Sequence, residues 1–376
     1  MRIVAVTTWF PTDVAASSGA FVAKDVRAIA EHADVSRIDV VHLVPPHQDD
    51  GRRTLVHDGI RVRRVPMGTQ APVGILAAAR ALGPLLEGAD VVHSMAFSSL
   101  LPFALRRPEV PWVHTEHWSG LTNPSTLPLS WRLVLPVLRP LLRMPDVVTA
   151  VCEYLADPIR HHRGARPTVT VPCIVPPRDE LTARPMRPRT PLRLVAVGGL
   201  VDRKDPILAV ETVAELARRG IEARLTWVGE GELRHAVERC AAKLGVAAAV
   251  RLAGTADTAG VSAALDDADL FFLPTRADNF CVSAAEALVH GRPVVVGATG
   301  GQGEYIDPRV GELVPEQDAM QYADAIVRTE RRTQHLNASD IAETIGDRFS
   351  SERVAGGYVE AYARAVRIRA TGGGRG

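Results

Sequence analysis

Aromatic residues, cysteine pairs, a surplus of one charge and long apolar runs are scarce or missing in this sequence. The four cysteines lie far apart and form no C-x-x-C pair, which argues against a zinc or disulfide framework and favours a reducing compartment. The 44 basic and 43 acidic residues leave a net charge of +1, without the basic surplus of a nucleic-acid-binding protein. No apolar run is long enough to predict a membrane span, and the first residues read as a strand and not as a signal peptide. We therefore expect a cytoplasmic protein that binds no nucleic acid.

Strand-like and helix-like stretches alternate through the whole chain. Short β-branched runs separated by Ala- and Leu-rich helical stretches lie at 3–8, 38–44, 91–94 and 112–115, and the alternation restarts at 192–197. Strands separated by helices predict parallel sheets with helices on both faces. The predicted fold is α/β, with two Rossmann-like doubly wound domains. Ligands are expected at the carboxyl ends of the strands, in a cleft between the domains.

Five prolines lie among arginines between about Val175 and Pro191, where few residues are apolar. Because proline fixes φ and removes an amide donor, this composition predicts a semi-rigid linker. We place the first domain at 1–180, the linker at 181–191 and the second domain at 192–350.

The strongest local signal is the stretch 277–288, where a loop follows a buried strand and opens a helix. Backbone N–H groups at a helix start lack intrahelical partners and can bind an anion. Asp278 in the loop is suited to hold sugar hydroxyls, and Glu286 in the helix to accept hydrogen bonds from a ribose. The alternative is that both carboxylates only complement the positive end of the helix.

A second signal follows the strand at 192–197. Gly198 and Gly199 end this strand, Arg203 and Lys204 lie in the next loop, and Pro206 occupies a favoured first helical position. Glycine lets the backbone approach a ligand closely, and Lys204 supplies a point charge for a diphosphate. The alternative is a solvated basic pair on the surface.

Together these stretches resemble glycosyltransferase family 4, whose members are retaining enzymes with the two-domain GT-B fold. The family has a G-R-L-x-x-x-K-G-like loop and an E-x7-E motif, and this chain offers 198–204 and 278–286 at matching spacing. Further similarities are those of 11–27 to the family's first loop and helix, 90–93 to its D-V-x-H strand, 115–117 to its T-x-H segment and 300–304 to its G-G-x-x-E loop.

The resemblance implies a role for individual residues. Lys204 would bind the diphosphate, Glu286 the ribose and Asp278 the transferred sugar. His117 would contact a sugar hydroxyl or the developing charge, although it also fits an ordinary polar residue at a strand end. The implied catalytic residues are His117, Lys204 and Asp278; the implied donor-binding residues are Gly19, Gly199, Arg203, Lys204, Asn279, Phe280, Cys281, Val282 and Glu286. The resemblance also implies that a C-terminal helix at 351–376 crosses back to the first domain.

The chain departs from the family pattern at several positions. Gly199 replaces the loop arginine, Asp278 replaces a glutamate, and Cys281 stands where glycine is usual. Cys173 stands where the family often has asparagine. We hypothesise that Arg203, which adjoins Lys204, takes the place of the missing arginine.

The expected reaction moves a hexose from a nucleotide-diphosphate sugar to a hydroxyl acceptor without a metal or other cofactor. Lys204, Arg203 and the helix start near 282 would neutralise the charge that builds on the leaving diphosphate. Asp267 and Asp269 form a D-x-D-like string, but they lie where a helix runs into a strand. We interpret them as capping and surface charge.

The first domain is expected to bind the acceptor. Its stretch 127–143 mixes apolar residues with Trp131 and arginines. It either lies on the inner face of a membrane, near a lipid-linked acceptor, or forms a packed crossover helix, which its prolines favour.

Two other functions are considered beside the glycosyltransferase. One is a sugar-nucleotide epimerase of GT-B-like fold, and the other is a catalytically degenerate sugar-nucleotide-binding protein, suggested by Gly199 and Asp278. A nicotinamide-dependent oxidoreductase is excluded because the loop after the first strand lacks G-x-G-x-x-G.

Overall fold

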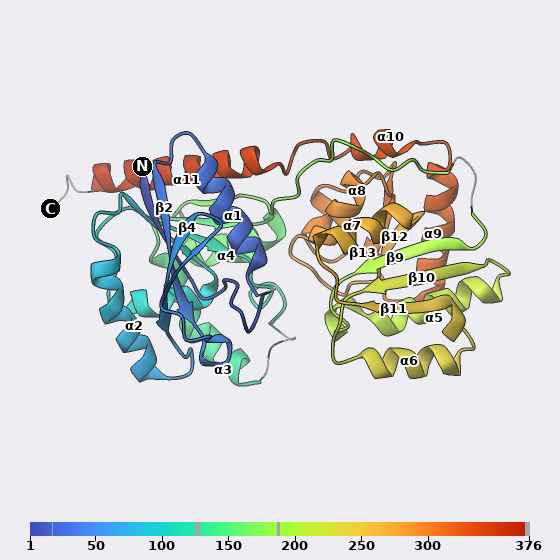
Figure 1. The fold of residues 1–376 in the computed structure, drawn as a ribbon, viewed down its shortest axis with the longest axis horizontal. Helices are drawn as coiled ribbons and strands as arrows, with labels where there is room; N and C mark the ends of the chain where they lie inside the picture. Colours follow the sequence, from blue (N-terminus) through green and yellow to red (C-terminus); the bar gives the residue numbers. More distant parts are fainter. Residues whose placement is uncertain (17, 125–126, 128, 186–188, 373–376) are drawn as a thin grey trace. The chain divides into compact units, whose positions relative to one another are not determined.

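The computed structural model describes residues 1–16, 18–124, 127, 129–185 and 189–372. It contains two compact units, one formed by Met1–Ile174 with Ser350–Gly376 and the other by Val175–Phe349. Figure 1 shows the two units as separate α/β bodies. No helix in the described part of the chain is long and apolar enough to cross a membrane.

An eight-stranded sheet forms the centre of the first unit, in the order β3-β4-β2-β1-β5-β6-β7-β8. Its neighbouring strands are parallel except for the antiparallel β3–β4 hairpin. The strands are β1 (Arg2–Thr7), β2 (Arg37–Val44), β3 (Thr54–His57), β4 (Ile60–Pro66), β5 (Val91–Met95), β6 (Trp112–Glu116), β7 (Val147–Ala150) and β8 (Thr168–Thr170). The helices are α1 (Ala20–Glu31), α2 (Pro72–Leu85), α3 (Leu129–Leu138), α4 (Glu153–Arg163) and α11 (Ser351–Gly372).

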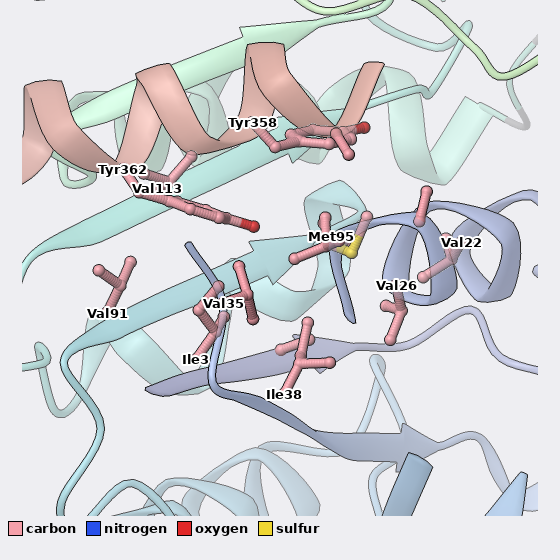
Figure 2. Close-up of a cluster of buried hydrophobic side chains, with 14 of the residues drawn as sticks. Ile3, Val22, Val26, Val35, Ile38, Val91, Met95, Val113, Tyr358 and Tyr362 are labelled. Atoms are coloured by element: carbon pink, nitrogen blue, oxygen red, sulfur yellow. The ribbon is translucent and has the colours of Figure 1, made fainter. Parts of the chain in front are cut away.

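The last helix, α11, completes the core of the first unit. It packs against α1 and the strands β6 and β7. Its buried Tyr358 and Tyr362 join a cluster that includes Ile3, Val26 and Met95, as Figure 2 shows. The end of the chain therefore stabilises a unit whose other elements all come from its first half.

A six-stranded parallel sheet forms the centre of the second unit, in the order β11-β10-β9-β12-β13-β14. Its strands are β9 (Leu192–Val197), β10 (Ala223–Val228), β11 (Val250–Gly254), β12 (Leu270–Leu273), β13 (Val294–Gly297) and β14 (Gly311–Val314). Its helices are α5 (Pro206–Arg218), α6 (Arg234–Lys243), α7 (Thr258–Asp267), α8 (Val282–Val289), α9 (Ala319–Thr333) and α10 (Ala338–Ala342). The strands β9, β12 and β13 are largely buried, as expected of a parallel sheet covered on both faces.

Each sheet has one point where its strand order reverses. The reversal lies between β1 and β5 in the first sheet and between β9 and β12 in the second. The loops that leave the carboxyl ends of such neighbouring strands diverge to opposite faces and leave a crevice, which is where open α/β sheets bind ligands. The structure thus places one candidate binding site on each unit.

The structure gives bounds to the helix expected within 127–143. The helical stretch that we expected to pack as a crossover helix lies at Leu129–Leu138, and a 3₁₀ turn over Arg139–Arg143 follows it because Pro140 supplies no amide hydrogen. Only Leu135 of the helix is buried. Trp131 of the helix packs against Trp118, so one face of the helix is packed and the opposite face is exposed.

Candidate functional site

The two loops that carried the strongest sequence signals meet at the strand reversal of the second unit. One loop follows β9 and the other follows β12, its neighbour in the sheet. The Lys204 ammonium group hydrogen-bonds the Asp278 carboxylate, and Arg203 Nη1 lies 3.1 Å from Asp278 Oδ2. Two cations from one loop therefore converge on the carboxylate of the other.

Glycines allow the loops at this edge of the sheet to pack closely. A Cβ atom on Gly229 would lie 2.0 Å from the Gly198 carbonyl oxygen, and one on Gly300 would lie 1.9 Å from that of Asp278. Gly199 has more room, with no heavy atom within 3.4 Å of its missing Cβ atom. A Cβ atom at Gly199 would thus make ordinary van der Waals contacts, so a side chain can begin at this position without a backbone clash.

Backbone contacts fix the approach to α8. The amide of Gly301 donates to the Asn279 carbonyl at 3.0 Å. The Tyr305 hydroxyl contacts the carbonyl oxygens of Phe280 and Cys281 at 2.9 and 2.8 Å. The Phe280 ring packs against Tyr305 and Phe349, so its side chain belongs to the core and only its backbone faces the loop chemistry.

Helix α8 begins at Val282, directly after Cys281 in the left-handed conformation with φ 57°. The amides of the first helical turn point outward from the helix end and carry its partial positive charge. Glu286 lies one turn further along the same helix. Burial raises the pKa of the Cys281 thiol to about 11, so this residue is a neutral part of the turn.

The two cations of this cluster stabilise a negative charge between them, here that of Asp278. Burial works to raise the pKa of Asp278, but the charges and hydrogen bonds of Lys204 and Arg203 outweigh it and hold that pKa below its ordinary value. The side chains of Lys204 and Asp278 are only 10% and 17% exposed. Charge pairs that are shielded from water interact more strongly than exposed pairs.

His117 and Gly19 belong to the first unit and lie close to each other there. Gly19 is the N-cap of α1 in the left-handed conformation, and a Cβ atom on it would meet the Trp9 backbone at 2.3 Å. The His117 ring, at the end of β6, packs on Phe21 of α1 with ring centroids 4.6 Å apart. Burial lowers the pKa of His117 to about 3, so the imidazole is neutral at physiological pH.

Asp25 is a buried partner of His117 that the sequence motifs did not indicate. Asp25 Oδ2 lies 3.7 Å from His117 Nε2 and accepts a hydrogen bond from the Tyr358 hydroxyl at 2.9 Å. Asp25 falls on the buried face of α1 between Val22 and Val26. A carboxylate on an apolar helix stripe is the signal that would have found it, because such a group is rarely buried without a partner.

The aspartates near the end of α7 form ion pairs with arginines. Asp267 pairs with Arg193, and Asp269 lies 3.4 Å from Arg189. Within the described ranges, no group of three or more His, Cys, Asp or Glu side chains is arranged to hold a metal ion.

Each unit is a doubly wound α/β unit, and the second has paired cations and a helix start at its strand reversal. These features are those of a protein of the GT-B glycosyltransferase class. Residues 22–174 match the family described as "Glycosyl transferase 4-like domain", and residues 191–331 match "Glycosyl transferases group 1". The chain belongs to this group 1, family 4 class of glycosyltransferases.

Individual relatives support this assignment. The chain is 30% identical over 279 residues to a GDP-mannose-dependent alpha-mannosyltransferase of Mycolicibacterium smegmatis, covering 69% of this chain and 71% of that protein. A protein of Escherichia coli named for colanic acid biosynthesis is 28% identical over 192 residues, which span 49% of this chain and about half, 47%, of the relative. The fold is similar to that of sucrose-phosphate synthase from Thermosynechococcus elongatus, with a TM-score of 0.78 at 19% identity over 97% of this chain and 99% of that one.

Proposed function

We propose that this glycosyltransferase moves a hexose from a nucleotide-diphosphate sugar to a hydroxyl acceptor, with retention of the anomeric configuration and without a metal ion. The observation that supports the proposal is the convergence of Lys204 and Arg203 on Asp278 beside the start of α8. A donor diphosphate that enters this site takes over the two cations, which Asp278 now holds in place. The freed carboxylate then accepts hydrogen bonds from hydroxyls of the transferred sugar.

The same cations serve the chemical step. The bond between the anomeric carbon and the diphosphate oxygen breaks, and the acceptor oxygen bonds to that carbon. The acceptor's proton passes to the departing diphosphate, so the products are a glycoside and a nucleoside diphosphate. Negative charge grows on the leaving oxygen during this step, and Lys204, Arg203 and the α8 amides stabilise it. In this proposal Glu286 binds the ribose, and backbone near Gly199, Asn279 and Val282 lines the donor.

Release of nucleoside diphosphate tests the proposal directly. GDP-mannose is the first donor to try, because a relative is named for it, with UDP- and ADP-sugars as comparisons. We expect Lys204→Ala to lower kcat/KM by about 10²–10³, as loss of one transition-state donor does elsewhere. Lys243→Ala, on α6, is the control and should leave the rate unchanged. Equal rates for the two variants would contradict the site.

Metal dependence and anomeric configuration are separate readouts. Turnover should persist in EDTA; loss of activity with chelator and recovery with magnesium would overturn the metal-free part of the proposal. The product anomer is read by NMR.

The two alternative functions give different products. An epimerase changes the donor sugar without forming an acceptor product, and a degenerate binding protein holds the donor but releases no nucleoside diphosphate with any acceptor. The named relatives are glycosyltransferases, which favours the transferase.

We also propose that α3 contacts an anionic lipid surface, which would bring a lipid-linked acceptor within reach. Leu129, Leu133 and Val137 are 68%, 70% and 76% exposed, and their spacing places them on one face of the helix. Arg132 lies in the same helix, and Arg139 and Arg143 follow it in a stretch that has no Asp or Glu from 127 to 143. An apolar face beside basic side chains is typical of helices that lie in a membrane interface.

Flotation with phosphatidylglycerol vesicles tests this contact. The double variant Leu133→Glu/Val137→Glu should lose flotation, whereas Val73→Glu, an exposed position on α2, should retain it. Wild-type protein that fails to float with these vesicles would remove the membrane proposal and leave the transferase proposal intact.

A further inference from the structure

A cavity of about 390 Å³ lies within the first unit at the carboxyl edge of its sheet. Its lining comes from the segments that follow β1, β2, β4, β5 and β6, together with α3. Strands β1 and β5 border the reversal of strand order, where a doubly wound sheet presents its ligand site. The volume lies in the range of small-molecule pockets, about 300–1,000 Å³.

Three tryptophans supply much of the aromatic surface of the cavity. Trp9 follows β1, Trp118 follows β6, and Trp131 lies on α3. The rings of Trp118 and Trp131 meet edge to face with centroids 5.7 Å apart, and Trp118 also packs against Phe97 at 5.5 Å. The chain has only five tryptophans, so more than half of them line this one cavity.

The cavity has no permanently charged side chain. Hydroxyls of Thr8, Ser18, Thr69 and Ser98, the amide of Gln48 and the imidazole of His47 line it, and none of its described lining residues is Asp, Glu, Lys or Arg. The second unit differs sharply, because Arg203 and Lys204 supply two cations at its strand reversal. A phosphorylated or carboxylated ligand would have to give up its water in the tryptophan-lined cavity without gaining the charge of a lysine or an arginine, which is costly.

From this contrast we infer that the cavity binds the acceptor and that its occupant is a neutral sugar ring stacked on Trp118 and Trp131. A pyranose has flat apolar faces that suit aromatic rings, and its rim of hydroxyls suits the alcohol and amide groups. The inference rests on the proposed transferase function and adds the acceptor class to it. It assigns charged and uncharged substrates to different units of the protein.

Binding to a glycan array tests the inference without any transfer reaction. The array carries neutral mannosides, glucosides and galactosides beside their phosphorylated and uronic-acid counterparts. We expect full-length protein to bind neutral glycans, and Trp131→Ala to weaken this binding about tenfold, a loss typical of a removed aromatic anchor. Trp118→Phe, which retains an aromatic face, should keep most of it.

Two controls distinguish a loss of glycan binding from a loss of folding. Val134→Ala lies on the same helix but outside the cavity and should bind as the wild type does. Donor binding by the second unit, followed by thermal shift with nucleoside diphosphates, should be the same in every cavity variant and shows that each one is folded.

A variant that adds a positive charge to the cavity tests the same inference in the opposite direction. Thr69→Lys introduces a cation into the cavity and should shift binding toward phosphorylated glycans. Binding of charged glycans alone by the wild type, binding of none, or tryptophan variants that bind unchanged would each overturn the inference. A failure of the transferase proposal would show instead as absent nucleoside diphosphate release while neutral glycans still bind.

Discussion

Asp278 is held by two basic side chains that differ in exposure. Lys204 is 10% exposed and Arg203 is 32% exposed, although both contact the same carboxylate oxygen. The buried ammonium group is already desolvated and fixed, whereas the guanidinium group retains contact with water. Lys204 should therefore contribute more to donor binding than Arg203. Arg203 should supply the second positive charge, which the family's arginine supplies at the position of Gly199.

We expect Arg203→Ala to weaken donor affinity by about tenfold, as loss of one charge-assisted hydrogen bond does. Titration calorimetry with the nucleoside diphosphate measures it, alongside Lys204→Ala. If Arg203→Ala binds as tightly as the wild type while Lys204→Ala binds weakly, the replacement of the missing arginine by Arg203 is refuted. Where Arg203→Ala has weakened binding, the double variant Gly199→Arg/Arg203→Ala should recover affinity, because it restores a cation at the position of the family's arginine.

Asp25 predicts a pH dependence of stability. Burial raises its pKa to about 7, above its ordinary value of 3.8 in the unfolded chain, and the Tyr358 hydrogen bond offsets only part of that effect. Between these two values the folded state binds more protons than the unfolded state, so the contribution of Asp25 to stability is full below pH 4 and is lost as the pH rises toward 7. The loss amounts to about 1.4 kcal/mol per pH unit at most.

Asp25→Asn should therefore be more stable than the wild type at pH 8 by a few kcal/mol, and similar to it at pH 4. Urea denaturation at both pH values measures the difference in the free energy of unfolding. Asp58→Asn, at a position 55% exposed, is the control and should show no such trend. A difference between Asp25→Asn and wild type that is the same at both pH values would contradict a raised pKa.

The loops after β12 and β13 are locked together by a close backbone approach. Gly300 has φ 137°, and its hydrogen on the Cβ side points at the Asp278 carbonyl, where a Cβ atom would come within 1.9 Å. No flexible side chain can yield there, because the obstacle is backbone. The position of Asp278 therefore depends on the absence of a side chain one strand away.

Gly300→Ala should lower the free energy of unfolding by about 2 kcal/mol or more and weaken donor binding, because the Asp278 loop must shift. Gly356→Ala is the matched control: it lies in α11 with nothing within 4 Å of its missing Cβ atom. That variant should instead gain about 0.5–1 kcal/mol, since alanine favours a helix over glycine. Thermal or urea unfolding of both proteins checks the opposite signs.

Most elements followed from local pattern. Buried β-branched runs and amphipathic stretches predicted strands at 3–8, 38–44, 91–94, 112–115 and 192–197 and the helix that begins at Val282, because these signals are contained in short windows of sequence. The strand β14 was not predicted. The sequence did not decide between the two interpretations of 127–143, because its prolines made the period ambiguous and an exposed apolar face has the same sequence pattern as a buried one. The α/β class with GT-B fold was confirmed.

The site was only partly accessible from sequence. The pairing of Lys204 with Asp278 depends on β9 lying next to β12, and strand order is decided by tertiary packing. The contact between Asp25 and Tyr358 spans 333 residues of sequence and leaves no local trace at Tyr358. The tryptophan-lined cavity needs six segments at once, so no single stretch predicts it.

The first unit is discontinuous in sequence, whereas the second is one continuous segment. Val175–Phe349 contains all six strands of its sheet, but the first unit needs Ser350–Gly376 to cover its core. We expect a fragment of residues 175–349 to fold alone and bind nucleoside diphosphate, and a fragment of residues 1–174 to remain unfolded. Circular dichroism and thermal melts of the two fragments measure this.

Addition of a 350–372 peptide to the 1–174 fragment should restore cooperative melting, and a peptide with Tyr358→Ala and Tyr362→Ala should not. A 1–174 fragment that melts cooperatively by itself would show that α11 is dispensable for the core.

The placement of α11 also fixes an order of events on the ribosome. The first half of the chain emerges early but cannot close its hydrophobic interior until residues 351–372 have been translated, by which time the middle segment can already have folded. Nascent chains that stall before Ser351 would thus carry a folded second unit and an incomplete first unit. A nonsense mutation at the start of α11 would therefore damage the unit that the first half of the chain builds.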